Sequence, residues 1–142
     1  MFKKVLVGVD GSEPSVKAIQ AARELLGKGA CEEVTAVFAL THLGDMAVKD
    51  FLVEKTQASP EQLAEANGIL EGAIKQAGGN EKIKTRIETG LPSEVILNLA
   101  KKEGYDLIVV GHRGFGHLKK LLLGSVGAQI VQSAHCTVMV VR

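Results

Sequence analysis

The sequence predicts an α/β fold, in which an open five-stranded parallel sheet carries helices on both faces. Short runs rich in Val, Ile and Leu alternate along the chain with amphipathic segments, the order expected when parallel strands are joined by helices. Glycine, proline or serine separates most of these segments. The composition is 46% hydrophobic but only 4% aromatic, so the core must be aliphatic, which suits a sheet buried on both faces.

Length and charge narrow the classes of function. The 142 residues fit a single domain spanning 1–142. With 17 basic and 16 acidic residues the net charge is +1, which argues against a dedicated nucleic-acid binder. The apolar run near the N-terminus is broken at Asp10, too early for a signal peptide or a membrane span. We therefore expect a soluble, cytoplasmic protein with no membrane or nucleic-acid partner.

The first part of the chain predicts two strands around one helix. A β-branched run ends at a turn signal, and Glu13 and Pro14 then suit the first turn of a helix. The expected elements are the strand Lys4–Val9, a helix capped by Ser12 or Ser15 and ended by Gly27 or Gly29, and the strand Glu33–Leu40.

The rest of the chain continues the alternation after one ambiguous segment. Thr41–Ser59 has mixed polarity and predicts either a loop or a short helix. Further elements are expected at Ser59–Gln76 (helix), Ile83–Glu88 (strand), Glu94–Glu103 (helix), Asp106–Val110 (strand), Val126–Ser133 (helix) and Cys136–Val141 (strand).

The carboxyl ends of three predicted strands carry candidate binding residues. Asp10, Ala39 and Gly111 lie at such ends. In an open parallel sheet these ends meet at one edge, and ligands bind where the strand order reverses. We expect the three residues to converge on one site.

A glycine motif predicts a phosphate site at that edge. Gly111 and Gly114 are followed after nine residues by Gly124-Ser125, which opens a predicted helix. Glycine permits close backbone approach, and a helix N-terminus offers N–H groups to an anion. Arg113, Lys119 and Lys120 add positive charge. The simpler alternative is a glycine-rich connection without a ligand.

Better-known motifs are absent. The loop lacks the Gly-Lys-Ser/Thr of a P-loop, and no GxGxxG follows the first strand. Asp10 is either a turn residue or a carboxylate that accepts hydrogen bonds from a ribose or adenine, or holds Mg²⁺ through water. His112 and His117 are solvated loop residues, with a metal site as the lesser alternative. No catalytic constellation emerges, and phosphoryl transfer would need more than one carboxylate.

The cysteines and the last strand suggest further features. Cys31 and Cys136 have no ligand spacing, so we expect two buried, reduced thiols rather than a zinc site. Thr137–Val141 is apolar; at a sheet edge it favours pairing with a second subunit, the alternative being a tolerated edge.

The chain resembles the universal stress protein family over essentially its whole length. The resemblance rests on the strand ending Val9-Asp10-Gly11-Ser12, the Gly90-Leu91-Pro92 turn, Asp106–Gly111, the Gly-x2-Gly-x9-Gly-Ser pattern at Gly111, Gly114, Gly124 and Ser125, and the closing Val138–Val141. It implies a Rossmann-like, adenine nucleotide alpha hydrolase-like fold and a homodimer joined through the last strand. Family members with the full glycine pattern look like ATP binders.

The resemblance also implies roles for individual residues. Asp10 would meet the ribose or adenine, and the Ala39 backbone would contact adenine. Two departures from the family pattern are the small Ala39 and the bulky His112. The phosphates would lie at Gly111, Gly114, Gly124 and Ser125, close to Arg113 and Val126, with Gly8, Val9, Val110 and His112 completing the lining.

These features favour a homodimeric stress-response protein that binds ATP, with Mg²⁺ as a possible companion, and senses or signals nucleotide state. The alternative is a slow ATPase or a nucleotidyl or phosphoryl transferase that uses the same pocket, with Asp10 and the loop histidines in chemical roles. A weaker third option is a structural stress protein with an empty pocket. The motifs specify no protein partner.

Overall fold

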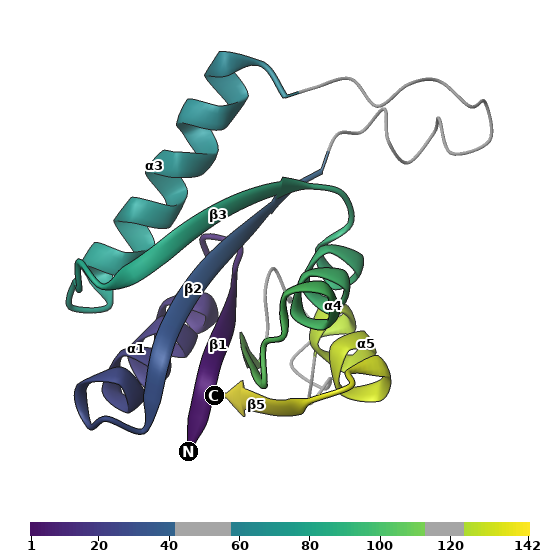
Figure 1. Ribbon diagram of the computed structural model, residues 1–142. Coiled ribbons are helices and arrows are strands. Elements are labelled where there is room, and N and C mark those ends of the chain that lie inside the picture. Colours follow the sequence, from purple (N-terminus) through teal and green to yellow (C-terminus); the bar gives the residue numbers. More distant parts are fainter. Residues whose placement is uncertain (42–57, 113–123) are drawn as a thin grey trace.

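A computed structural model describes residues 1–41, 58–112 and 124–142. Five parallel strands form one sheet in the order β3-β2-β1-β4-β5, which confirms the predicted fold class (Figure 1). Predictions made for Thr41–Ser59 lie largely outside the described residues. The elements are β1 (Phe2–Val9), α1 (Glu13–Gly27), β2 (Cys31–Leu40), α3 (Pro60–Gln76), β3 (Ile83–Thr89), α4 (Pro92–Glu103), β4 (Leu107–Gly111), α5 (Ser125–Ser133) and β5 (Thr137–Val141).

Several element boundaries differ from those that the sequence predicted. β1 begins at Phe2 rather than Lys4, and β2 at Cys31 rather than Glu33, because Phe2 and Cys31 pair with each other. Helix α4 begins at Pro92 rather than Glu94, since proline is well suited to the first helical turn. The remaining starts and ends shift by a residue or so, as helix and strand termini commonly do.

Helices cover both faces of the sheet. In β1, Val5 and Val7 pack with α1 and α3 in one core cluster, whereas Leu6 packs with α4 and α5 in the other. All three side chains are fully buried. Burial on both faces explains why the sequences of the strands are continuous apolar runs. Burying each such side chain stabilises the folded state by about 1.5–3 kcal/mol.

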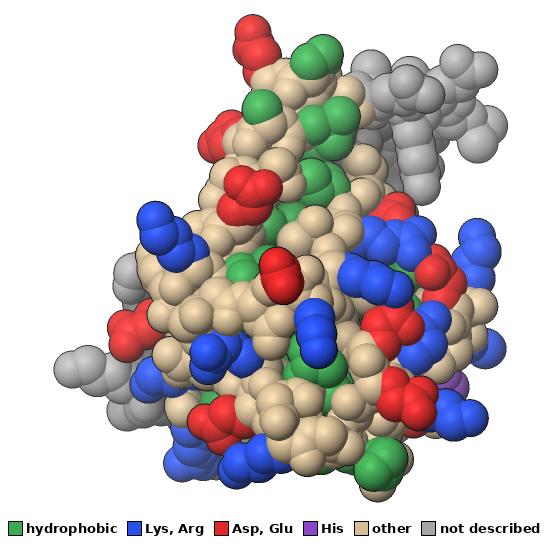
Figure 2. Space-filling view, turned by 60° about the vertical axis from the view of Figure 1, so that its left-hand side comes forward, with side chains coloured by type: hydrophobic (Ala, Val, Ile, Leu, Met, Phe, Trp, Pro, Cys, Tyr) green, Lys and Arg blue, Asp and Glu red, His purple; other side chains and the backbone are tan. Residues whose placement is uncertain are grey.

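One face of the molecule carries charges of both signs. On the face seen in Figure 2, Lys and Arg side chains are interspersed with Asp and Glu. In the described ranges, no helix combines the length and apolar character needed to cross a bilayer.

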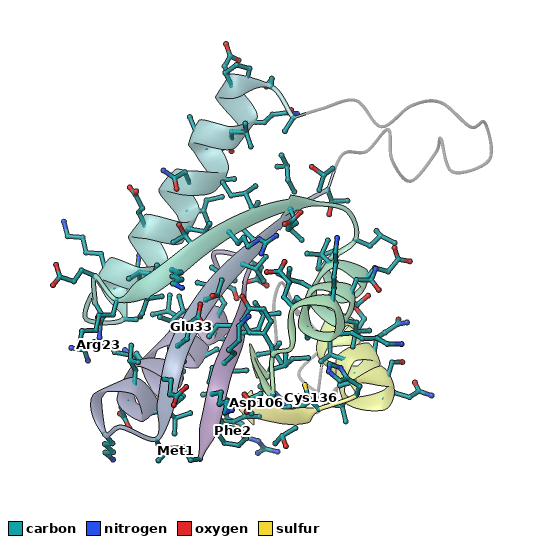
Figure 3. The ribbon with its side chains drawn as sticks, in the orientation of Figure 1. Met1, Phe2, Arg23, Glu33, Asp106 and Cys136 are labelled. Carbon is teal, nitrogen blue, oxygen red and sulfur yellow. The ribbon has the colours of Figure 1, made fainter. Side chains whose placement is uncertain are left out.

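Asp106 ties β4 to β1 at the amino end of the sheet, where it lies beside Phe2 (Figure 3). Its carboxylate accepts hydrogen bonds from the backbone N–H groups of Lys3 and Lys4, both at 2.9 Å. Its own N–H donates to the Lys4 carbonyl at 3.0 Å. Partial burial by itself raises the pKa of Asp106, but the backbone N–H donors outweigh it and hold the pKa below its ordinary value of 3.8.

Replacing Asp106 therefore tests a pH-dependent contribution to stability. Because the folded-state pKa is the lower one, this contribution is complete above about pH 3.8 and disappears as the pH falls through the folded-state value. We expect Asp106→Asn to lower the free energy of unfolding by about 1 kcal/mol at neutral pH. Urea unfolding of the wild type and the variant at neutral pH and at about pH 3 measures this difference in free energy. An equal difference at both pH values would contradict the stabilising role of the Asp106 carboxylate.

Candidate functional site

The site lies at the carboxyl edge of the sheet, where the strand order reverses between β1 and β4. The pairing between these two strands ends at Val7 and Val109. Both strands nevertheless continue, β1 through Gly8 and Val9, and β4 through Val110 and Gly111. Ligands of open α/β sheets usually bind where the strand order reverses, and Gly8, Val9, Val110 and Gly111, which the sequence predicts to contact a ligand, lie at these strand ends.

Packing restricts the glycines at the ends of β1 and β4 to different degrees, since Gly8 faces the end of a flexible side chain and Gly111 faces backbone. A Cβ on Gly8 would lie 2.7 Å from Ile96 Cδ1 of α4. A Cβ on Gly111 would lie 2.5 Å from the carbonyl carbon of Pro14, so the first turn of α1 sits directly against the end of β4. Sequence reasoning assigned Gly111 to a phosphate and missed this contact, because Pro14 is far away in the sequence.

Asp10 follows β1 and is held by the turn that starts α1. Its Oδ1 accepts hydrogen bonds from the Ser12 N–H at 2.9 Å and from the Ser12 hydroxyl. Ser12 is the N-cap of α1, which resolves the choice between Ser12 and Ser15 left open by the sequence. Asp10 thus takes part in the turn; its role toward a ligand remains a prediction.

The backbone of Ala39 is directed at the crevice side of β2. The Leu40 carbonyl accepts a hydrogen bond from Gly90 beyond β3, so the preceding residue points its backbone groups toward β1. The β1–β2 pairing ends at Val9 and Phe38. The Ala39 carbonyl therefore lies where the ladder ends, close in the fold to Asp10, as an adenine-contacting group would require.

Helix α5 presents an uncapped N-terminus at the same edge. Gly124 is its N-cap, in an extended conformation, and no side chain caps the first turn. The Gly124 N–H donates to the His112 carbonyl at 3.0 Å, which joins the end of β4 to the start of α5. Ser125 is exposed, Val126 is 36% exposed and Gly127 is buried, so the first turn of α5 lies partly at the surface of the described structure.

This helix N-terminus differs from the others in the described ranges. Ser12 caps α1 and Ser59 caps α3, and both helices carry a glutamate in the first turn. Helix α4 has Glu94 in its first turn. Among the described helices only α5 has neither a side-chain cap nor an acidic residue there. The N–H groups of its first turn, which have no side-chain cap among the described residues, and its positive dipole end suit an anion.

The backbone and the side chain of His112 contact different parts of the structure. Its backbone contacts Gly124, while its imidazole lines a small open pocket with Glu13, Pro14, Lys17 and Arg142. The imidazole Nε2 is buried and has no hydrogen-bond partner among the described residues. The remaining candidates of the glycine loop, Arg113, Gly114, His117, Lys119 and Lys120, lie outside the described residues.

The cysteines are apart from this site. Both are free thiols; Cys31 is buried as expected, but Cys136 is only half-buried. Burial, followed by the nearby Asp106 charge, raises the pKa of both thiols, which keeps them protonated and poorly nucleophilic. In the part of the chain that the structure describes, no cluster of three or more His, Cys, Asp or Glu side chains could hold a metal.

The contact between Gly111 and Pro14 is directly testable. We expect Gly111→Ala to destabilise the fold by about 1–3 kcal/mol, because the new methyl group meets backbone that cannot yield easily. Gly68→Ala is the matched control: it lies exposed in α3 with nothing within 4 Å of an added Cβ, and should stabilise by about 0.5–1 kcal/mol. Urea unfolding measures the stability of both variants. A Gly111→Ala protein as stable as the wild type would refute the close packing of Gly111 against Pro14.

Comparison with known proteins agrees with this architecture. Residues 1–142 match the family model described as the Universal stress protein family. Universal stress protein YxiE of Bacillus subtilis (strain 168) is 36% identical over 157 residues, covering 100% of both chains. The structure of hypothetical protein MJ0577 is similar with a TM-score of 0.76 at 30% identity, covering 99% of this chain and 96% of that one.

A second solved structure carries a ligand. It is a universal stress protein in complex with cAMP, with a TM-score of 0.65 at 27% identity, covering 99% of this chain and 97% of that chain. The sheet order and helix placement described above are those of the UspA-like, adenine nucleotide alpha hydrolase-like fold. The chain belongs to the universal stress protein family.

Proposed function

We propose that this chain is an ATP-binding universal stress protein that acts as a homodimer and responds to nucleotide state in the stress response. The observation that carries the proposal is the N-terminus of α5, which opens uncapped and without an acidic residue at the carboxyl edge of the sheet. The hydrogen bond from Gly124 to His112 keeps that N-terminus next to the end of β4, which supports a site at this edge. The phosphates of a nucleotide would bind there.

The remaining parts of an adenine nucleotide have suitable partners along the same edge. The Ala39 carbonyl would accept from the adenine amino group, and the Asp10 carboxylate from a sugar hydroxyl. The relative solved with cAMP, itself an adenine nucleotide, supports this ligand class. Mg²⁺ would be held mainly by the phosphates, with Asp10 reaching it through water.

Sensing is favoured over rapid catalysis. Phosphoryl transfer needs a positioned base and metal ligands besides a phosphate site. At the crevice, Asp10 is the carboxylate that follows β1, and one of its oxygens already accepts two hydrogen bonds from Ser12. A slow ATPase or transferase remains the alternative, and an ATP hydrolysis assay with Asp10→Ala as control separates it from simple binding.

The two edges of the sheet indicate where a second copy would pair. Edge strand β3 carries Lys84, Arg86 and Glu88, and its cations form ion pairs with Glu33 and Glu103, a charged edge of the kind that resists pairing. Edge strand β5 carries Thr, Val and Met without a charge. We therefore place the dimer interface at β5.

A charge introduced into α5 tests the phosphate site. We expect Ser125→Glu to weaken ATP binding at least about ten-fold, because the carboxylate competes with phosphate for the open N–H groups. The helix itself should tolerate a glutamate in its first turn. Titration calorimetry with ATP and Mg²⁺ measures the affinity.

Two controls make the calorimetry specific. Gln129→Glu makes the same charge change at an exposed position later in α5, and should alter ATP affinity little. Adenosine, which lacks phosphates, should bind the wild type and Ser125→Glu equally. Absence of ATP binding by the wild type would overturn the proposed function.

A proline in β5 tests the dimer interface. The Val141 carbonyl accepts from the His112 N–H on the β4 side, so Val140 directs its own N–H toward the open edge. Val140→Pro should therefore remove an outward N–H, leave the β4 ladder intact and give a monomer. Val140→Thr is the matched control that keeps the N–H and should remain dimeric. Analytical ultracentrifugation measures the mass, and a dimeric Val140→Pro protein would exclude β5 as the interface.

A further inference from the structure

The turn between β1 and α1 contains a closed set of hydrogen bonds around Asp10. The Ser12 N–H and the Ser12 hydroxyl both donate to Asp10 Oδ1. The Ser15 hydroxyl donates to the Ser12 carbonyl at 2.9 Å and accepts from the Asp10 N–H at 3.4 Å. Ser15 is buried, with 3% of its surface exposed, so the set is anchored in the protein interior.

The Ser12 hydroxyl makes a shorter hydrogen bond to Asp10 than to the first turn of α1. As the N-cap of α1, Ser12 Oγ accepts from the Ser15 N–H at 3.4 Å, a long contact for a hydrogen bond. A hydroxyl has one proton to donate, and here that proton goes to the Asp10 carboxylate. Hydrogen bonds to a charged acceptor are the stronger kind.

These bonds leave the two carboxylate oxygens of Asp10 with different surroundings. Oδ1 receives both Ser12 donors, whereas the described residues direct no recorded hydrogen bond at Oδ2. Oδ2 is therefore the oxygen that these bonds leave available to a ligand donor, and the two Ser12 donors fix the orientation of the carboxylate. Fixing a binding group before the ligand arrives avoids an ordering cost on binding.

We propose that Ser12 is a positioning residue, which holds Asp10 so that Oδ2 accepts a hydrogen bond from a sugar hydroxyl of the nucleotide. This inference rests on the proposed function, because it assumes that a nucleotide occupies the crevice. It assigns Ser12 a second role beyond capping α1.

The test pairs protein variants with a ligand that lacks the sugar hydroxyls. ATP and 2′,3′-dideoxy-ATP are titrated, with Mg²⁺, against the wild type, Ser12→Gly, Ser12→Thr and Asp10→Ala. Glycine is a tolerated N-cap that costs only a few tenths of a kcal/mol relative to serine, so Ser12→Gly removes the hydroxyl and little helix stability. Threonine keeps a hydroxyl. Ser59→Ala, at the N-cap of α3, is the matched capping control.

The expected pattern separates positioning from capping. The wild type should prefer ATP over the dideoxy analogue by about five-fold or more, as for one hydrogen bond to a charged group. Asp10→Ala should abolish that preference, Ser12→Gly should reduce it to about two-fold, and Ser12→Thr should restore it. Ser59→Ala should lower the thermal midpoint but leave the preference unchanged.

Two results would overturn the inference in different ways. If the wild type binds ATP and Ser12→Gly keeps the full preference for ATP, Ser12 is only a cap and the proposed function stands. If the wild type binds neither nucleotide, the proposed function fails and the inference fails with it.

Discussion

Burial of a parallel sheet on both faces is the constraint on which the rest of this molecule depends. Each strand must be followed by a helix that returns to the amino edge, so the helices begin at the carboxyl edge of the sheet. The same constraint brings the ends of β1, β2 and β4 together there. A ligand at this edge can meet strand carbonyls and helix N–H groups at once.

Capping then decides which helix N-terminus is available. The fold alone makes the helix starts nearly equivalent, since each has unpaired N–H groups. At α1 and α3 a serine side chain occupies an N–H group of the first turn, and a glutamate in that turn repels anions. At α4, Glu94 repels anions in the same way. Helix α5 starts with Gly124-Ser125, and among the described residues neither a side-chain cap nor an acidic residue stands in its first turn. In the proposed site, the choice of helix would therefore arise from small differences between otherwise similar turns.

Much of this could be predicted from the sequence, because it depends on local patterns. Periodicity located every described strand and helix, and strand ends placed Asp10, Ala39 and Gly111 at one edge. The early start of β1 was missed because it depends on pairing between Phe2 and Cys31. The contact between Gly111 and Pro14, and the direction of the His112 imidazole, were missed because both depend on α1 packing against β4.

The peptide groups around His112 connect the two surfaces to which we assign function. The His112 N–H donates to the Val141 carbonyl at the end of β5, at 2.7 Å, and its carbonyl accepts from Gly124 at the start of α5. In the proposed dimer, a partner strand on β5 and a phosphate on α5 would each act on a bond of this one residue. Two sites influence each other only through a structural element that both bias. The backbone of His112 contacts both elements directly, and neither bond involves its imidazole, so the connection does not depend on which side chain stands at this position.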